Sequence, residues 1–163
     1  MLATGPGRVH PETANRMDMV VMVGDNVLYG KYDGSQVEYN GRVHQLIRDD
    51  DVLLTYDGED VTLETAMLTK DNVLVELPIK ENATVAGLVV STSSDENVIS
   101  ASADYGKVIK VGNGRQAGGA CRMDIQVKPG DQIQFRRYAG EQIKIEGTSY
   151  LVLKCYDVLA KVK

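Results

Sequence analysis

The chain has 163 residues, of which 43% are hydrophobic and 25% charged, a composition that predicts one or two folded domains and excludes a disordered polypeptide. Its net charge of -5 disfavours binding to nucleic acid phosphates or to acidic membrane surfaces, and its apolar runs are far shorter than the ~20 residues that span a bilayer, so we expect neither nucleic acid nor membrane as a partner. Two cysteines, Cys121 and Cys155, form no disulfide framework and favour a reducing compartment.

Short Val-rich segments bounded by Gly, Asp and Asn predict strands throughout the chain and no helix beyond a turn or two. Turn signals such as Asp33-Gly34, Asn40-Gly41 and Glu146-Gly147 separate these segments. Strands of this length and spacing are typical of an all-β protein built from small barrels or sandwiches. In chain order, the predicted strands are 20–23, 26–29, 45–47, 52–56, 73–77, 107–111, 133–135, 142–145, 150–154 and 158–162.

The sequence contains an internal repeat at an offset of 106 positions. Residues 16–55 align with 122–161 without a gap and are identical at 13 of 40 positions. If the offset is increased by one residue, 5–8 also matches 112–115. The repeat predicts two copies of one fold, in domains 1–68 and 69–163. The first copy begins at the counterpart of Val108 and has no equivalent of 71–107, so we expect it to lack its first strand and the following loop.

Five segments of the second copy together form a specific pattern. They are 71–75 (DNVLV), 86–90 (AGLVV), 106–114 (GKVIKVGNG), 127–131 (VKPGD) and 157–160 (DVLA). With them the second copy resembles the GroES-type ten-kilodalton co-chaperonin family along its whole length, and two fused units resemble the tandem co-chaperonin of plastids, here with the first unit truncated at its N-terminus. Departures from the pattern fall at Leu68, where proline is usual, at Asn72, where a basic residue is usual, and at Ala86, where glycine is usual.

The resemblance implies two tandem GroES-like β-barrels, the first incomplete, with no enzymatic activity and no cofactor. It implies a co-chaperonin that binds the ATP-bound sixty-kilodalton chaperonin, caps its folding chamber and assists ATP-dependent protein folding. It also implies residence in the plastid stroma, with another soluble reducing compartment as the alternative.

Residues 80–100 are mostly small and polar, which predicts a mobile loop, and the apolar tripeptide in their middle suits docking into a groove. In the resembled family this loop grips the chaperonin, so the resemblance assigns that contact to Ala86, Gly87, Leu88, Val89 and Val90. The alternative interpretation makes 87–90 a barrel strand in a long hairpin.

The resemblance further implies a roof hairpin and an oligomer interface. The roof would contain Gln116, Ala117, Gly118, Gly119 and Ala120, with His10, Pro11 and Glu12 in the first copy. The interface would join the first strand of one unit (Val73, Leu74, Val75) to the last strand of the next (Val158, Leu159, Ala160). Within the chain we expect 52–56 to pair with 73–77. The strand 158–162 then needs a first strand from another chain. We therefore expect homo-oligomers of this chain to be small or heterogeneous, unless upstream residues, or sister subunits in a hetero-oligomer, supply the missing strand.

Other patterns give weak signals for chemistry. Residues 112–117 match the glycine fingerprint of dinucleotide sites, but the glycine-rich continuation favours a hairpin over the required helix. The histidines and cysteines show no zinc-site spacing and no catalytic arrangement, so we expect no metal and no catalytic residue. The run 49–51 (DDD) indicates a solvated turn, and the tyrosines at 29, 32, 39, 138 and 150 indicate barrel packing.

Two alternatives remain open beside the co-chaperonin hypothesis. One is an oligomeric adaptor that keeps GroES-like barrels without capping a chaperonin. The other is a detached fragment of a zinc-dependent medium-chain dehydrogenase, whose catalytic domain shares the barrel type.

Overall fold

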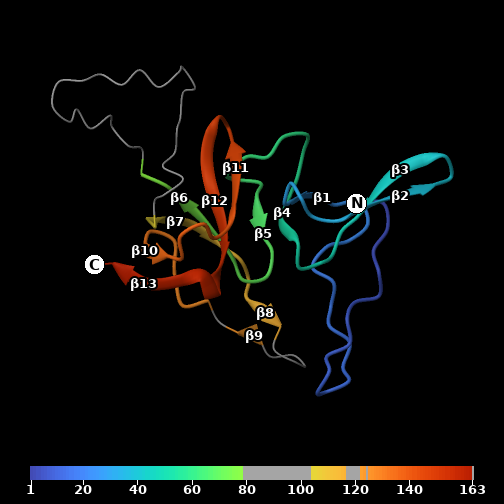
Figure 1. Cartoon of the computed structure of the whole chain (residues 1–163), viewed down its shortest axis with the longest axis horizontal. Helices are drawn as coiled ribbons and strands as arrows, with labels where there is room; N and C mark the ends of the chain where they lie inside the picture. Colours follow the sequence, from blue (N-terminus) through green and yellow to red (C-terminus); the bar gives the residue numbers. More distant parts are fainter. Residues whose placement is uncertain (79–103, 117–121, 124, 163) are drawn as a thin grey trace.

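The computed structural model describes residues 1–78, 104–116, 122–123 and 125–162 (Figure 1). The described part is all β apart from one 3-10 turn, η1 (Cys155–Asp157), which confirms the predicted fold class. The strands are β1 (Asn26–Tyr29), β2 (Ser35–Tyr39), β3 (Arg42–Leu46), β4 (Val52–Tyr56), β5 (Met67–Leu68), β6 (Asn72–Glu76), β7 (Tyr105–Val111), β8 (Arg115–Gln116), β9 (Arg122–Met123), β10 (Gln132–Phe135), β11 (Glu141–Ile145), β12 (Thr148–Lys154) and β13 (Val158–Val162).

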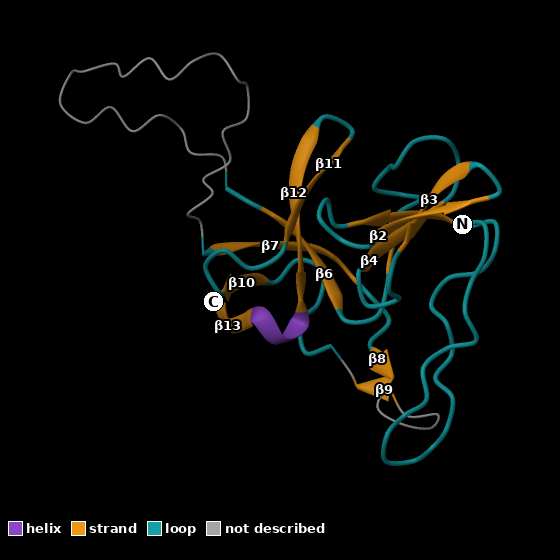
Figure 2. Cartoon of the chain, turned by 45° about the vertical axis from the view of Figure 1, so that its right-hand side comes forward, coloured by secondary structure: helices purple, strands orange, loops and turns teal. Residues whose placement is uncertain are grey.

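The strands form two larger sheets and two hairpins, with every pairing antiparallel (Figure 2). The six-stranded sheet of the second repeat has the order β11-β12-β6-β7-β10-β13. The first repeat contributes a three-stranded sheet, β1-β4-β5, and the separate hairpin β2-β3, while β8 and β9 form the other hairpin. The second repeat therefore holds the larger and more continuous sheet.

The backbone repeats at the same offset as the sequence. Strands β1 to β4 recur as β10 to β13, beginning 106 positions later in each case. Pairing starts at Asn26↔Tyr56 in one copy and at Gln132↔Val162 in the other, and both pairs carry a bulge at the same place. Glycines with positive φ recur as well, as at Gly24 and Gly130 (101° and 94°). The structure thus confirms the repeat predicted from the sequence.

The first copy lacks counterparts of β6 and β7 among the described residues. In the second repeat β12 lies between β11 and β6, whereas its counterpart β3 pairs with β2 alone. Positions that are buried in the second copy are consequently exposed in the first: Ile145 is 1% exposed and its counterpart Tyr39 67%. The prediction of an incomplete first barrel is confirmed.

The pairing predicted between 52–56 and 73–77 is wrong. β4 instead pairs with β5, with Leu54 opposite Leu68. The chain turns between the two strands because Lys70 has a φ of 50° and the Asn72 amide donates to the Thr69 carbonyl oxygen at 3.1 Å. The segment 67–76 therefore supplies one strand to each repeat. It contains no glycine that would predict the turn from the sequence.

This turn also changes part of the predicted oligomer interface. Val73, Leu74 and Val75 are completely buried in β6, whose two edges are paired with β12 and β7. They are core residues and offer no surface to another chain, so their assignment to a contact between chains is wrong.

Several local predictions also need correction. Residues 20–23 form no strand, because the Met22 amide donates to Asp25 Oδ2 at 2.8 Å and the chain turns there. The short strands β2, β5, β8 and β9 carry no Val-rich signal and were not predicted. Tyr150 packs in the core as predicted, but Tyr32, Tyr39 and Tyr138 are exposed.

Two buried clusters form the core. One belongs to the second repeat and is centred on Val73, Val108, Ile133 and Phe135. The other joins both repeats and consists of Leu53, Leu54, Ala66, Leu68, Leu74, Ile143, Ile145, Tyr150 and Val152. The repeats thus share a core rather than meeting as two separately closed barrels. No helix in the described ranges is long and apolar enough to span a membrane.

Candidate functional site

The best-defined site is the junction where β4 of the first repeat meets β5 and the second barrel. Leu53 and Leu54 of β4 are buried in the shared core with Leu68 of β5. Pairing of Leu54 with Leu68 adds main-chain hydrogen bonds to this apolar contact. Burial on this scale stabilises by about 1.5 to 3 kcal/mol for each large aliphatic side chain, so the apolar contact dominates the junction.

Two polar side chains bind the backbone of β4 inside the junction. Thr69 Oγ1 donates to the Val52 carbonyl oxygen at 2.5 Å. Asn72 Nδ2 donates to the carbonyl oxygens of Leu53 at 2.8 Å and of Val52 at 3.2 Å. Asn72 is only 1% exposed, and leaving these carbonyl oxygens unpaired in the interior would be costly. The departure from the family pattern at this position is therefore a link between the repeats.

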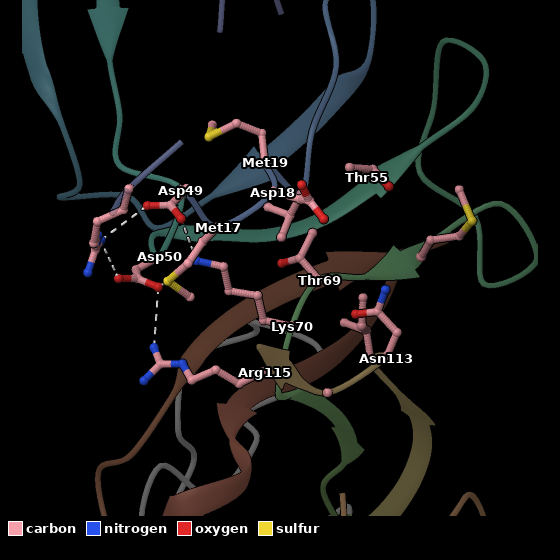
Figure 3. Close-up of a pocket in the computed structure, with 15 residues that line it drawn as sticks. Met17, Asp18, Met19, Asp49, Asp50, Thr55, Thr69, Lys70, Asn113 and Arg115 are labelled. Carbon is pink, nitrogen blue, oxygen red and sulfur yellow. Dashed lines mark hydrogen bonds and ion pairs between the residues drawn. The ribbon is translucent and has the colours of Figure 1, made fainter. Parts of the chain in front are cut away.

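An ion-pair cluster closes the junction beside these bonds (Figure 3). Lys70 Nζ lies 2.7 Å from Asp49 Oδ2 and 2.6 Å from Asp50 Oδ1. Arg8 Nη2 lies 2.7 Å from Asp50 Oδ2 and 3.2 Å from Asp49 Oδ1, and Arg115 Nη2 lies 3.2 Å from Asp50 Oδ1. Residues 49–51 form a turn as predicted, but the carboxylates of Asp49 and Asp50 are held by cations from distant segments, which the prediction of a solvated turn did not include.

The charges of this cluster shift the pKa values of its members. Partial burial acts to raise the pKa of Asp50, but hydrogen bonds and charge from Lys70 and Arg8 outweigh it and lower that pKa to about 2. The hydrogen bond with Asp50 is the main cause of a raised pKa at Arg8. Lys154 donates from Nζ to the Asp50 carbonyl oxygen at 2.9 Å, and burial lowers the pKa of its ammonium group. Asp50 therefore stays ionised at neutral pH.

A cavity of about 490 Å³ lies at this junction and is lined by both repeats. Its lining contains Arg8, Met17 and Met19 from the first repeat and Asn113 and Arg115 from the second, but no His, Cys, Ser or Tyr. Across the described ranges, no group of three His, Cys, Asp or Glu side chains is placed to hold a metal ion. The arrangement joins two β units.

The proposed chaperonin-binding residues, Ala86, Gly87, Leu88, Val89 and Val90, lie outside the described residues. Their segment connects β6 to β7, and these strands pair side by side up to Glu76 and Lys107. The two ends of the connection thus leave a paired part of the second barrel at neighbouring positions.

The predicted roof residues lie on two hairpins. Gln116 belongs to β8, which pairs with β9, so the glycine fingerprint continues into a strand as predicted; Ala117, Gly118, Gly119 and Ala120, like Cys121, lie outside the described residues. In the first repeat a bridge between Val9 and Arg16 closes a turn that contains His10, Pro11 and Glu12. Residues 8–17 and the β8-β9 hairpin lie at the same end of the molecule, the lower end in both views (Figures 1 and 2).

The predicted interface residues of the last strand lie at a sheet edge. Leu159 and Ala160 are exposed, Val158 is half-buried, and β13 pairs only with β10 within the described part of the chain. The counterpart β4 carries β5 on the corresponding edge. The edge of β4 that pairs with β5 therefore corresponds to an edge of β13 that has no paired strand in the described part of the chain.

Sequence reasoning missed the residues that hold the junction: Asp49, Asp50, Thr69, Lys70, Asn72 and Arg115. A usable signal was present in the repeat, because Asp49 and Asp50 correspond to Cys155 and Tyr156 in the second copy. Positions at which two copies of one fold differ in charge are candidates for the surface on which the copies meet.

The sequence model of the family described as "Chaperonin 10 Kd subunit" matches residues 1–56 and 66–162, which include every strand on both sides of the junction. The chain belongs to this family. The dehydrogenase alternative loses its support, since the barrels are those of the co-chaperonin family.

Relatives of two lengths match the chain. It is 29% identical to the 20 kDa chloroplastic chaperonin of Spinacia oleracea over 89% of this chain and 54% of the relative, and 28% identical to that of Arabidopsis thaliana over 98% and 60%. It is also 38% identical to the co-chaperonin GroES of Bacillus subtilis over 56% of this chain and 93% of the relative. The chain thus spans little more than half the length of its chloroplastic relatives.

Proposed function

We propose that this protein is a co-chaperonin that binds a sixty-kilodalton chaperonin in its ATP-bound state, caps the folding chamber and assists protein folding without enzymatic activity of its own. The observation that carries the proposal is the match with GroES: 93% of the length of the Bacillus relative aligns with 56% of this chain. One co-chaperonin unit is therefore present at nearly full length.

Contact with the chaperonin is proposed for residues 86–90. The support comes from the sequence, in which Leu88, Val89 and Val90 form an apolar tripeptide between polar stretches. The strands on either side support the same assignment. β6 and β7 pair as far as Glu76 and Lys107, so the segment that carries 86–90 begins and ends at neighbouring positions of the barrel. Burial of three aliphatic side chains in a groove provides several kcal/mol, tempered by the cost of ordering the segment.

The remaining assignments are parts of the same proposal. The chain is divided into units 1–68 and 69–163, the two hairpins contribute to a roof, and Val158, Leu159 and Ala160 contact another chain in a homo-oligomer or hetero-oligomer. Two relatives bear the word chloroplastic in their names, which supports the plastid stroma as the location.

A capture experiment tests the proposal. The tagged full chain is incubated with a sixty-kilodalton chaperonin, with and without ATP, beside the variants Val89→Asp and Val43→Asp. Val43 is an exposed valine of β3 and serves as a matched control for the added charge. We expect ATP-dependent retention of the chaperonin by the wild type and the control and its loss with Val89→Asp.

Two results would contradict the proposal at different points. Equal retention by Val89→Asp would show that the contact lies elsewhere than in 86–90. Failure of the wild type to retain the chaperonin or to assist refolding of a test substrate under any nucleotide condition would favour the adaptor alternative.

A further inference from the structure

The hairpin β2-β3 presents three apolar side chains to solvent on one face, beside Ser35, Arg42 and His44. Pairing of Val37 with His44 and of Ser35 with Leu46 puts alternate residues on the same side of the hairpin. Val37, Tyr39 and Leu46 share this face and are all exposed. Their counterparts in the second repeat, Ile143, Ile145 and Val152, are buried in the shared core. The first repeat therefore keeps three apolar side chains of the corresponding core face, but they are exposed.

The second repeat shows what pairs along the edge of such a face. There β6 pairs along the free edge of β12, with Leu74 opposite Val152 and Glu76 opposite Tyr150. Leu74 also joins the cluster that contains Ile143 and Ile145. One strand thus supplies the main-chain hydrogen bonds of the edge and an apolar side chain beside Val152, while Leu53, Leu54 and Leu68 of the first repeat pack on the face.

The first repeat keeps both flanks of the place that β6 occupies. In the second repeat β6 lies between β12 and β7, and Val108 of β7 exchanges hydrogen bonds with Asp131 and Gly130 at 2.9 and 2.8 Å. Met1 makes the equivalent bonds: its amino group donates to the Asp25 carbonyl oxygen at 2.5 Å, and its carbonyl oxygen accepts from the Gly24 amide at 3.0 Å. Met1 therefore stands where Val108 of β7 stands.

A groove separates these flanks. A cavity of about 100 Å³ is lined on one side by Met1, Ala3, Thr4 and Gly5 and on the other by residues 45–48, which run along the edge of β3. The volume is smaller than a five-residue strand, so an incoming strand has to push residues 3–5 outward. Pairing along the open edge and burial of Leu46 beside an apolar residue of the incoming strand favour that displacement.

We propose that the open edge of β3 accepts, antiparallel, a strand of another polypeptide that follows the pattern of β6, with three apolar central residues and a carboxylate at its C-terminal end. Transfer of the β12-β6 register places the equivalent of Leu74 opposite Leu46 and the equivalent of Glu76 opposite His44. Arg42 and Arg48 flank this stretch of β3 and favour a strand with carboxylates over one with lysines. The strand completes the first barrel as β6 completes the second.

A peptide with the sequence of residues 70–78 (KDNVLVELP) is the probe for this site. The labelled peptide is titrated into the full chain and followed by fluorescence anisotropy, and hydrogen exchange with mass spectrometry locates the contact. We expect saturable one-to-one binding and slower exchange over 42–46, with exchange over 148–154 unchanged because β6 already occupies that edge. No chaperonin is present, so the outcome does not depend on the proposed function.

Matched variants identify the edge. Leu46→Asp places a charge on the apolar face at an exposed position, and we expect it to weaken binding at least tenfold; Arg42→Glu, which removes no apolar surface, should weaken it less. Leu159→Asp alters the other open edge, β13, at a comparably exposed leucine and should leave binding unchanged. A peptide with aspartate in place of the residue equivalent to Leu74 should not bind.

Three results would overturn the inference. Absence of saturable binding would do so, as would protection of 158–162 in place of 42–46, which would assign the peptide to β13. The third is concentration-dependent self-association of the chain that Leu46→Asp abolishes while the peptide fails to bind, which would show that a second copy of this chain covers the edge.

Discussion

Leu53 and Leu159 occupy the same position in the two repeats, yet Leu53 is 6% exposed and Leu159 is 59% exposed. Each lies in the corresponding strand of its repeat, in β4 and β13 respectively. The difference arises because β5 and the second barrel cover β4, whereas β13 ends the six-stranded sheet. One residue type in one backbone setting is thus a core residue at the junction and a surface residue at the open edge.

This pair gives a direct measure of the junction. Truncation of a buried leucine costs about 2 to 5 kcal/mol, whereas truncation of an exposed one changes stability by less than about 0.5 kcal/mol. We expect Leu53→Ala to lower the free energy of unfolding by about 2 to 4 kcal/mol and Leu159→Ala to leave it nearly unchanged, as measured by urea denaturation. Similar losses from the two variants would mean that β13 is covered in solution, for example by another chain.

Asn72 should stabilise the junction through its side-chain amide. Asn72→Ala removes the donor to the carbonyl oxygens of Val52 and Leu53 in a site that water does not reach, which costs about 1 to 3 kcal/mol. The control is Asn26→Ala, because Asn26 Nδ2 also donates to a carbonyl oxygen, that of Gly58, at 2.8 Å but at an exposed position. Thermal unfolding should show a clear loss for the first variant and little for the second; equal effects would refute the role given to burial.

Asp50 should make the stability of the junction depend on pH. Its pKa of about 2 in the folded protein lies below the ordinary value of 3.8, so between these values the unfolded chain binds the proton more readily. The stabilisation is complete above about pH 4 and is lost as the pH falls toward 2. The shift corresponds to about 2 kcal/mol, which solvent screening of this partly exposed side chain reduces to about 1 kcal/mol.

The variant Asp50→Asn isolates this contribution. We expect it to be less stable than the wild type by about 1 kcal/mol at pH 7 and by less at pH 3, since the wild type has lost part of the effect there. Asp57→Asn removes an exposed carboxylate with no ion pair in the described part of the chain and serves as the control. A difference between wild type and Asp50→Asn that stays constant from pH 7 to pH 3 would contradict the assignment.

Gly140 and Gly130 should respond differently to alanine. Both have positive φ, 81° and 94°, so both variants carry backbone strain of about 1 kcal/mol. A Cβ at Gly140 would meet the Val152 carbonyl oxygen of the neighbouring strand, whereas at Gly130 nothing lies within 4 Å. Gly140→Ala should therefore destabilise the second barrel by clearly more than Gly130→Ala in urea denaturation; an equal loss would show that the turn at Gly140 relaxes freely.

Much of the architecture could be predicted from the sequence because it depends on local patterns. Alternating apolar residues place most strands, and Gly24 and Gly130 mark turns whose positive φ favours glycine. The offset of 106 positions predicts that both copies fold alike, and the structure repeats it down to a bulge in the same strand pair. The sequence also predicts that the first copy has no counterpart of β6, because the repeat contains no equivalent of residues 71–107 in that copy.

The junction could not be predicted in this way, because it depends on which distant segments meet. Nothing local to Lys70 predicts its turn, yet that turn divides 67–76 between two sheets and carries the Lys70 ammonium group to Asp49 and Asp50. Asn72 has the same amide wherever it stands, and only burial beside β4 makes it a link. The sequence by itself determined the two copies and their strands, and tertiary structure alone decided how they join, since packing and ion pairing depend on distances in space that no spacing along the chain defines.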